Sequence, residues 1–130
     1  KMAGPTIERL GRVAEEDSPT YYAKCQGFIF PQEEDFGIVA IEALASGRPL
    51  VAYRGGDIAE HLEEGKTGVF FDEQTPEAIV CAMKSFRAAD YDPHSIRSQA
   101  LSFDKELFKT KIQSYIEKAL EKHLIERKII

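Results

Sequence analysis

The sequence predicts an α/β fold in which a mainly parallel sheet is covered by helices on both faces. Short runs of β-branched and aromatic residues alternate along the chain with longer segments of helical periodicity. Strands that alternate with helices pair in parallel, because each helix carries the chain back over the sheet. The chain has 130 residues, 43% of them hydrophobic, which is enough to bury one core. We therefore expect a single domain over residues 1–130.

Start and stop residues mark the individual elements. Thr75 and Pro76 start a helix, because threonine caps a first turn well and proline fits the first helical position. Gly47 ends an earlier helix, since glycine readily adopts the left-handed conformation that closes helices. The expected strands are 7–13, 27–31, 48–53 and 68–71. The expected helices are 20–25 (capped by Asp17 or Ser18), 36–46, a short one ending at 64–65, 76–87, 93–101 and a long one from 104. The expected buried face of helix 36–46 consists of Ile38, Ile41, Leu44 and Ala45.

Charge and composition exclude several classes of protein. The net charge of -5 and the pI near 5.3 argue against nucleic-acid binding, which needs a basic face. No apolar run approaches the roughly 18 residues of a membrane span. Cys25 and Cys81 lack metal-ligand spacing and are expected to be reduced, buried small hydrophobes. These features predict a cytoplasmic protein, with peripheral membrane association of a full-length form left open.

The segment from Glu34 to Glu42 carries the main chemical signal. Glu42 stands among apolar neighbours, so it must lie at the wet edge of its helix or be paired, because an unpaired buried charge is costly. Glu34 precedes the helix, whose first free amides can bind an anion. Eight residues of helix rise about 12 Å, which is comparable to a diphosphate with a sugar on each side. Gly37 would let the backbone approach such a ligand closely.

Taken alone, these two glutamates also fit a solvated loop followed by a core helix with one glutamate at its edge. The flanking residues favour the ligand site. With seven residues between them, Glu34 and Glu42 match the Glu-x7-Glu motif of retaining glycosyltransferases with two Rossmann-like domains, the GT-B type. The sequence most resembles the C-terminal domain of family four, also called group one. The likeness is good over residues 7–87, through Phe36-Gly37, the 42–51 run, Gly55-Gly56 and 65–68.

The resemblance implies a role for each matching residue. Glu34 is the expected catalytic residue, contacting the donated sugar and stabilising charge at its anomeric carbon. Glu42 is expected to hold the ribose hydroxyls of the nucleotide. The remaining donor-binding residues are expected to be Arg12 and Val13 beside the base, Asp35, Phe36, Gly37 and Ile38 at the sugar and diphosphate, and Gly55 and Gly56 near the phosphates. Asp35 departs from the family, many members of which carry glycine there.

The resemblance also implies a reaction. A hexosyl unit would pass from a nucleoside-diphosphate sugar, a GDP- or UDP-hexose, to an acceptor hydroxyl with retention of configuration, without a metal or cofactor. The sequence Glu-Glu-Asp-Phe-Gly-Ile over 33–38 is similar to that of mannosyltransferases of surface-polysaccharide biosynthesis. Family members bind the acceptor, here a sugar or lipid-linked glycan, in an N-terminal domain that also carries a Gly-rich loop. They neutralise the diphosphate with a Lys or Arg earlier in the C-terminal domain.

Neither region is found in this sequence, so we expect a fragment of a larger enzyme that is inactive alone. Two other functions stay open: a non-catalytic nucleotide-sugar-binding module, and a sugar-nucleotide epimerase or phosphorylase on the related scaffold. The last helix carries an apolar stripe that is expected to be core, with exposure or burial in a homodimer as the alternative. The stripe consists of Leu107, Phe108, Ile112, Tyr115, Ile116 and Ala119.

Other short motifs are interpreted as structural. Gly65-Lys66-Thr67 ends like a P-loop, but Glu60 stands where that motif needs glycine, so a tight turn into a strand is expected. Asp90-Tyr91-Asp92 is expected to be a solvated turn between helices. No metal site is expected, because the three histidines have no ligand spacing and are assigned to surface or capping positions. They are His61, His94 and His123.

Overall fold

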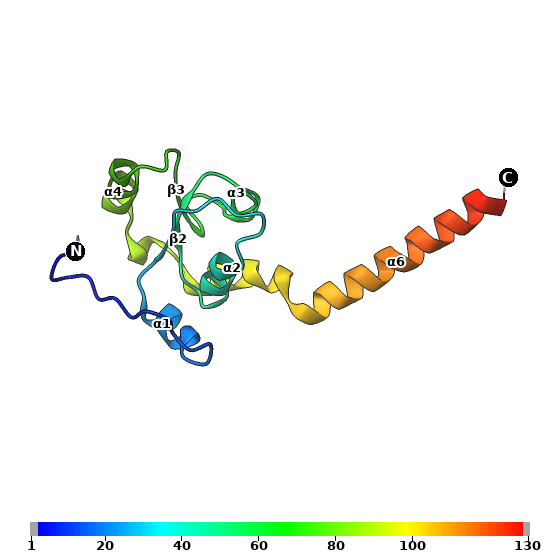
Figure 1. Cartoon of the computed structure of the whole chain (residues 1–130), viewed down its shortest axis with the longest axis horizontal. Helices are drawn as coiled ribbons and strands as arrows, with labels where there is room; N and C mark the ends of the chain where they lie inside the picture. Colours follow the sequence, from blue (N-terminus) through cyan, green and yellow to red (C-terminus); the bar gives the residue numbers. More distant parts are fainter. Residues whose placement is uncertain (1–2, 129–130) are drawn as a thin grey trace.

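A three-stranded parallel sheet forms the centre of the computed structural model, which describes residues 3–128 (Figure 1). The strands β1 (Phe28–Phe30), β2 (Leu50–Tyr53) and β3 (Gly68–Phe71) lie in the order β1–β2–β3. In the parallel register Ile29 pairs with Val51, which pairs in turn with Val69. The predicted α/β class with a parallel sheet is confirmed.

Helices connect and cover these strands. Thr75 caps α4 as predicted, because its side chain accepts a hydrogen bond from the amide of Ala78 at 3.2 Å. Asp92, in the predicted turn, caps α5 by accepting from the amides of His94 and Ser95. The α-helices are α1 (Ser18–Lys24), α2 (Ile38–Ala45), α3 (Ile58–His61), α4 (Pro76–Ser85), α5 (Pro93–Ala100) and α6 (Lys105–Lys128), with 3₁₀ turns η1 (Ala88–Asp90) and η2 (Leu101–Phe103).

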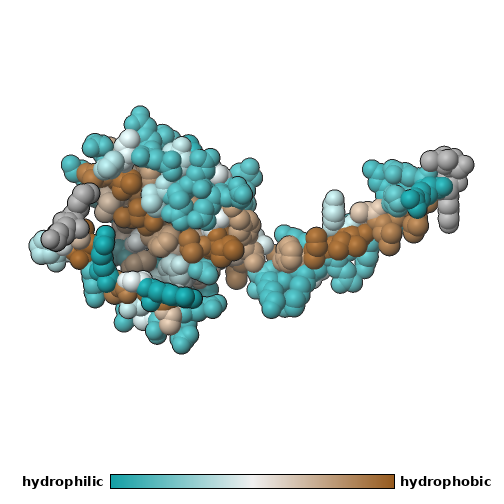
Figure 2. All heavy atoms as spheres, viewed as in Figure 1, coloured by the Kyte–Doolittle hydropathy of each residue, from teal (hydrophilic) through white to brown (hydrophobic). Residues whose placement is uncertain are grey.

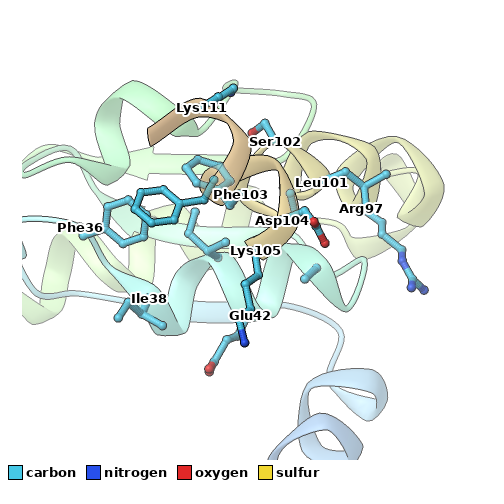
Figure 3. A pocket seen from close by; sticks show the side chains of 14 residues that line it. Phe36, Ile38, Glu42, Arg97, Leu101, Ser102, Phe103, Asp104, Lys105 and Lys111 are labelled. Atoms are coloured by element: carbon cyan, nitrogen blue, oxygen red, sulfur yellow. The ribbon is translucent and has the colours of Figure 1, made fainter. Parts of the chain in front are cut away.

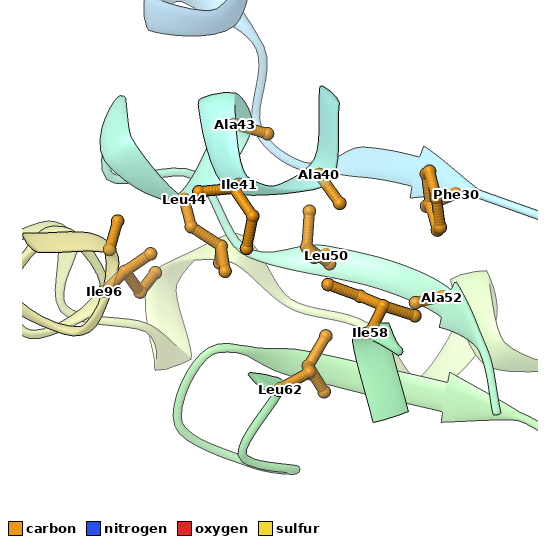
Figure 4. Close-up of a cluster of buried hydrophobic side chains, with 11 residues drawn as sticks. Phe30, Ala40, Ile41, Ala43, Leu44, Leu50, Ala52, Ile58, Leu62 and Ile96 are labelled. Atoms are coloured by element: carbon orange, nitrogen blue, oxygen red, sulfur yellow. The ribbon is translucent and has the colours of Figure 1, made fainter. Parts of the chain in front are cut away.

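The side chains of β2 alternate between two hydrophobic clusters, one on each face of the sheet. Leu50 and Ala52 point into the larger cluster, which α2, α3 and α5 cover (Figure 4). Val51 points to the opposite face, where Phe71 and Ala82 of α4 complete a smaller cluster. Helices therefore cover both faces, as predicted. The larger cluster consists of Phe30, Ala40, Ile41, Ala43, Leu44, Leu50, Ala52, Ile58, Leu62, Ile96 and Ala100.

Two of the four residues that were predicted for the buried face of α2 are exposed. Ile41 and Leu44 are buried as expected, but Ile38 is 63% exposed and Ala45 is exposed as well. Ile38 and Ala45 are two helical turns apart, so they lie on the same side of α2 as the exposed Glu42 and not on the side that faces the core. Ala40 and Ala43, which the prediction left out, are buried and complete the core-facing side. Ile38 is thereby free to line a surface hollow.

Residues 7–13 do not form the predicted strand. A strand needs a neighbour for its backbone groups, and no other strand lies beside this segment in residues 3–128. Gly11 adopts a left-handed conformation, φ 68°, which breaks the extended run. Ile7 is 59% exposed. The segment is a surface loop that leads into α1.

The apolar stripe of α6 is exposed, so the prediction that it belongs to the core is wrong for this chain. Beyond its first turn, α6 projects away from the sheet and its helices (Figure 1), and a run of hydrophobic atoms follows its length (Figure 2). An amphipathic pattern predicts that a helix packs its apolar face against another surface. Within residues 3–128, no such surface covers most of α6. None of the described helices is both long and apolar enough to cross a membrane. The stripe residues Leu107, Phe108, Ile112, Tyr115 and Ile116 are between 38% and 69% exposed.

The cysteines and the glycine turn settle two smaller predictions. Both cysteines are free as expected, but Cys81 is exposed rather than buried. Cys25 is partly buried, and this burial raises the pKa of its thiol. Gly65 sits at φ 80° in a tight turn that leads into β3, and the buried Thr67 closes the turn by accepting from the Glu63 amide at 2.9 Å. The turn interpretation is confirmed.

Candidate functional site

The two segments whose residues were predicted to contact the donor meet at the carboxyl edge of the sheet. One follows β1 and contains Glu34, and the other follows β2 and contains Gly55 and Gly56. The amide of Asp57 donates to the carbonyl of Glu34 at 3.1 Å. Gly56, at φ 65°, packs so closely that a Cβ there would lie 2.9 Å from the Glu34 amide nitrogen and closer still to its carbonyl oxygen. The second loop therefore braces the first.

Gly37 shapes the entry into α2. It adopts a left-handed conformation, φ 73°, and its carbonyl accepts from the amides of Ala40 and Ile41. A Cβ at this position would lie 3.2 Å from the ring of Phe30, a tighter contact than side chains normally make. The backbone of the loop thus lies directly on the core at Gly37, and its close approach to a ligand stays a prediction.

The start of α2 presents unpaired amides to solvent. Within residues 3–127, the backbone N–H groups of 35–39 donate to no protein acceptor. A hollow of about 460 Å³ lies over this loop and is lined by 33–39, which includes the predicted Asp35, Phe36, Gly37 and Ile38. Free amides at a helix start form a binding place for anions, since their partial positive charges point outward.

Glu34 is exposed at the rim of this hollow. Gln32 donates through Nε2 to Glu34 Oε1 at 2.8 Å, and Glu34 makes no ion pair within the described residues. Its carboxylate is therefore held by a neutral donor and keeps its charge available. Gln32 was not among the predicted site residues.

Glu42 lies on the solvent-facing side of α2, and it is both at the wet edge and paired. The hydroxyl of Tyr22 donates to Glu42 Oε2 at 3.1 Å across twenty residues of sequence. Burial, followed by this hydrogen bond to Glu42, raises the pKa of Tyr22 to about 12. Tyr22 was also missed, because it stands beside a second tyrosine in an ordinary helical segment and no spacing links it to the motif.

The predicted base loop and Glu42 share one hollow. It has a volume of about 670 Å³ and lies between the segment before α1 and the exposed face of α2. Arg12 and Val13 line one side of it, while Val39 and Glu42 line the other. The structure thus brings Arg12, Val13 and Glu42 together, although 28 residues lie between Val13 and Glu42 in the sequence.

A third, mostly apolar hollow of about 650 Å³ lies between α2, η2 and the start of α6 (Figure 3). Phe36 and Ile38 enter it from the motif, so these residues contribute side chains and not only amides. The ring of Phe103 packs edge-on against Phe36 at 5.8 Å and against His61 at 4.8 Å between centroids. Sequence reasoning missed Phe103, whose place depends on how the chain turns into α6.

Arg54 and His61, two basic residues near this edge, are engaged in ion pairs within the fold. Arg54, directly after β2, forms ion pairs with Glu64 at 2.9 Å and with Asp72 at 2.7 Å, and its guanidinium lies over the ring of Phe70. The hydrogen bond from Arg54 lowers the pKa of Glu64. His61 pairs with Asp57 at 2.9 Å. Within the described part of the chain, no group of three His, Cys, Asp or Glu side chains is arranged to hold a metal ion.

Comparison with known proteins agrees with this geometry. The parallel sheet, its helices and the loops at its carboxyl edge define an α/β domain of the GT-B type. A family model described as "Glycosyl transferases group 1" matches residues 1–88. The chain therefore belongs to the group 1 glycosyl transferases.

Individual relatives show the extent of the likeness. The D-inositol 3-phosphate glycosyltransferase of Corynebacterium kroppenstedtii is 33% identical over 82 residues, which cover 62% of this chain and 18% of the relative. A GDP-mannose-dependent α-(1-6)-phosphatidylinositol monomannoside mannosyltransferase of Mycolicibacterium smegmatis is 32% identical over 104 residues, covering 62% of this chain and 27% of the relative. The Anabaena protein HepE, solved with UDP and glucose, superposes with a TM-score of 0.66 and 25% identity over 84% of this chain and 31% of that chain. The alignments thus cover less than a third of each of these proteins.

Proposed function

We propose that this chain supplies donor binding to a retaining glycosyltransferase that transfers a hexosyl unit from a nucleoside-diphosphate sugar to an acceptor hydroxyl. One observation carries the proposal. Glu34, the unpaired amides of 35–39 and Glu42 follow one another along the rim of adjacent hollows, with Arg12 and Val13 facing Glu42. This order corresponds to sugar, diphosphate, ribose and base. Membership of the group 1 family supports the same assignment.

Each group then has a chemical task. The amides of 35–39 meet the charge of the diphosphate without a metal ion, through fixed dipoles that need no reorganisation. Glu34 contacts the hydroxyls of the donated sugar and stabilises the positive charge that develops at its anomeric carbon. Glu42 accepts hydrogen bonds from the ribose hydroxyls, while Arg12 and Val13 pack against the base. Gly55 and Gly56 keep the second loop close to the phosphates.

The relatives support a sugar nucleotide without deciding its base. The mycobacterial relative is named as GDP-mannose-dependent, and HepE was solved with UDP and glucose. The likeness of the sequence over 33–38 to mannosyltransferases favours a mannosyl donor and a role in polysaccharide biosynthesis. The acceptor, a sugar or a lipid-linked glycan, would bind on an N-terminal domain of a larger cytoplasmic enzyme. Because the acceptor-binding N-terminal domain is absent from this chain, the chain alone should transfer no sugar.

Titration with GDP, UDP and ADP, with and without attached sugars, tests this proposal. For the isolated chain, an open half-site should bind with a dissociation constant of about a millimolar, near -4 kcal/mol, which NMR titration can follow. In the full-length protein, Glu42→Gln should weaken nucleotide binding about tenfold to a hundredfold, because a hydrogen bond to a charged group contributes roughly 1.5–3 kcal/mol. Unchanged affinity in this variant would remove Glu42 from the site.

A further inference from the structure

The carboxylate of Glu42 receives one hydrogen bond within residues 3–127, and its donor is the hydroxyl of Tyr22. We propose that Tyr22 is a positioning residue that holds Glu42 Oε2, so that Oε1 is presented to the ribose hydroxyls of a nucleoside diphosphate. The proposal rests on the function proposed above and assigns a role to a residue outside the motif.

A neutral donor suits this task better than a cation. An ionised carboxylate has about four acceptor positions, and Tyr22 occupies one of them. A lysine or arginine would neutralise Glu42 and compete with ligand hydroxyls, whereas a phenol fixes the rotamer and leaves the negative charge in place. A phenol is protonated and able to donate at neutral pH, and burial, followed by the hydrogen bond to Glu42, raises the pKa of Tyr22 to about 12, so the hydroxyl goes on donating in alkaline solution.

The phenol is itself held in place. The ring of Tyr22 packs edge-on against Phe28 of β1, with centroids 5.5 Å apart and an interplanar angle of 69°. The guanidinium of Arg48, in the turn after α2, donates to the carbonyl of Ala23. Helix α1 is thus fastened both to the sheet and to the segment that follows α2. Tyr22 is therefore a rigidly held donor, and its hydrogen bond fixes the position of the flexible Glu42 side chain.

Tyr22 also lines the hollow that Glu42 shares with Arg12 and Val13. A direct contact between Tyr22 and the ligand is therefore the competing explanation, and the test must separate the two. Tyr22→Phe removes the hydroxyl and keeps the ring on Phe28. Tyr21→Phe is the matched control, since Tyr21 is adjacent on α1, is 48% exposed and makes no side-chain hydrogen bond within the described residues.

The experiment measures UDP and GDP binding to the full-length protein and its variants, with melting temperatures to confirm folding. Tyr22→Phe should weaken binding threefold to tenfold, equivalent to about 0.7–1.4 kcal/mol, while Tyr21→Phe binds like the wild type. In a Glu42→Ala background, which has no side-chain acceptor, Tyr22→Phe should add less than twofold, because the two residues act as one unit. With the 2′,3′-dideoxy nucleotides, which lack both ribose hydroxyls, wild type and Tyr22→Phe should bind equally.

The outcomes distinguish the failure of each proposal. Unchanged binding in Tyr22→Phe overturns the positioning role, provided that Glu42→Gln still weakens binding. A loss that persists undiminished in the Glu42→Ala background, or with the dideoxy nucleotides, shows that Tyr22 acts on the ligand or the fold without Glu42. If Glu42→Gln itself has no effect, the proposed nucleotide site fails and the role of Tyr22 fails with it.

Discussion

Replacing Gly56 with alanine tests whether the loop after β2 braces Glu34. Gly56 has φ 65°, a conformation that costs an L-residue about 1–2 kcal/mol. The new Cβ would also press on the backbone of Glu34, 2.9 Å from its amide nitrogen, and such overpacking costs about 1–3 kcal/mol. Gly56→Ala should therefore lower the free energy of unfolding by roughly 2–5 kcal/mol.

Gly65→Ala is the matched control, because it carries the conformational cost without the collision. Gly65 has φ 80°, and nothing lies within 4 Å of a Cβ placed there. Urea denaturation should show a loss of only about 1–2 kcal/mol for this variant. In the full-length protein, Gly56→Ala should also reduce sugar transfer by displacing Glu34, whereas Gly65→Ala should leave transfer unchanged. Equal destabilisation by the two variants, or full activity in Gly56→Ala, would refute the bracing of Glu34.

Three further predictions concern catalysis, stability and pH. Glu34→Ala should cut turnover of the full-length protein about a hundredfold or more with little change in affinity for the bare nucleoside diphosphate; equal losses in both quantities would reduce Glu34 to a loop-shaping residue. Leu44→Ala should lower the unfolding free energy by about 2–5 kcal/mol, while Ile38→Ala, at an exposed position, should change it by less than about 0.5 kcal/mol in urea denaturation. Because the pKa of Tyr22 is raised in the folded state to about 12, its contribution to stability is complete below pH 10 and is lost as the pH rises from 10 through 12. Denaturation across this range should show a smaller decline in Tyr22→Phe, and an identical decline would contradict the shift.

The parts of the fold that depend on local pattern could be predicted from the sequence. The strands at 28–30, 50–53 and 68–71 are short apolar runs between turn residues, and Thr75 caps its helix through a bond three residues away. The Glu34–Glu42 motif was visible for the same reason, since its spacing is set within one loop and one helix. The family it indicated is the family to which the chain belongs.

Packing between distant segments decided the rest. Residues 7–13 have the composition of a strand, but no neighbouring strand pairs with them in the described part of the chain. The stripe on α6 has the periodicity of a buried face, but the body of the fold ends where that helix begins (Figure 1). A hydrophobic pattern specifies which side of an element avoids water, and only the assembled structure specifies whether another surface covers it.

The candidate site divides in the same way. The identities of Glu34, Glu42 and Gly37 could be derived from the sequence, because their chemistry is local to the loop and helix. The hydrogen bond from Tyr22 to Glu42 and the contact of Gly56 with Glu34 span about twenty residues each, and no spacing rule connects such positions. The hydrogen bond exists because α1 packs beside α2. The contact of Gly56 with Glu34 exists because parallel strands bring successive loops to one edge of the sheet.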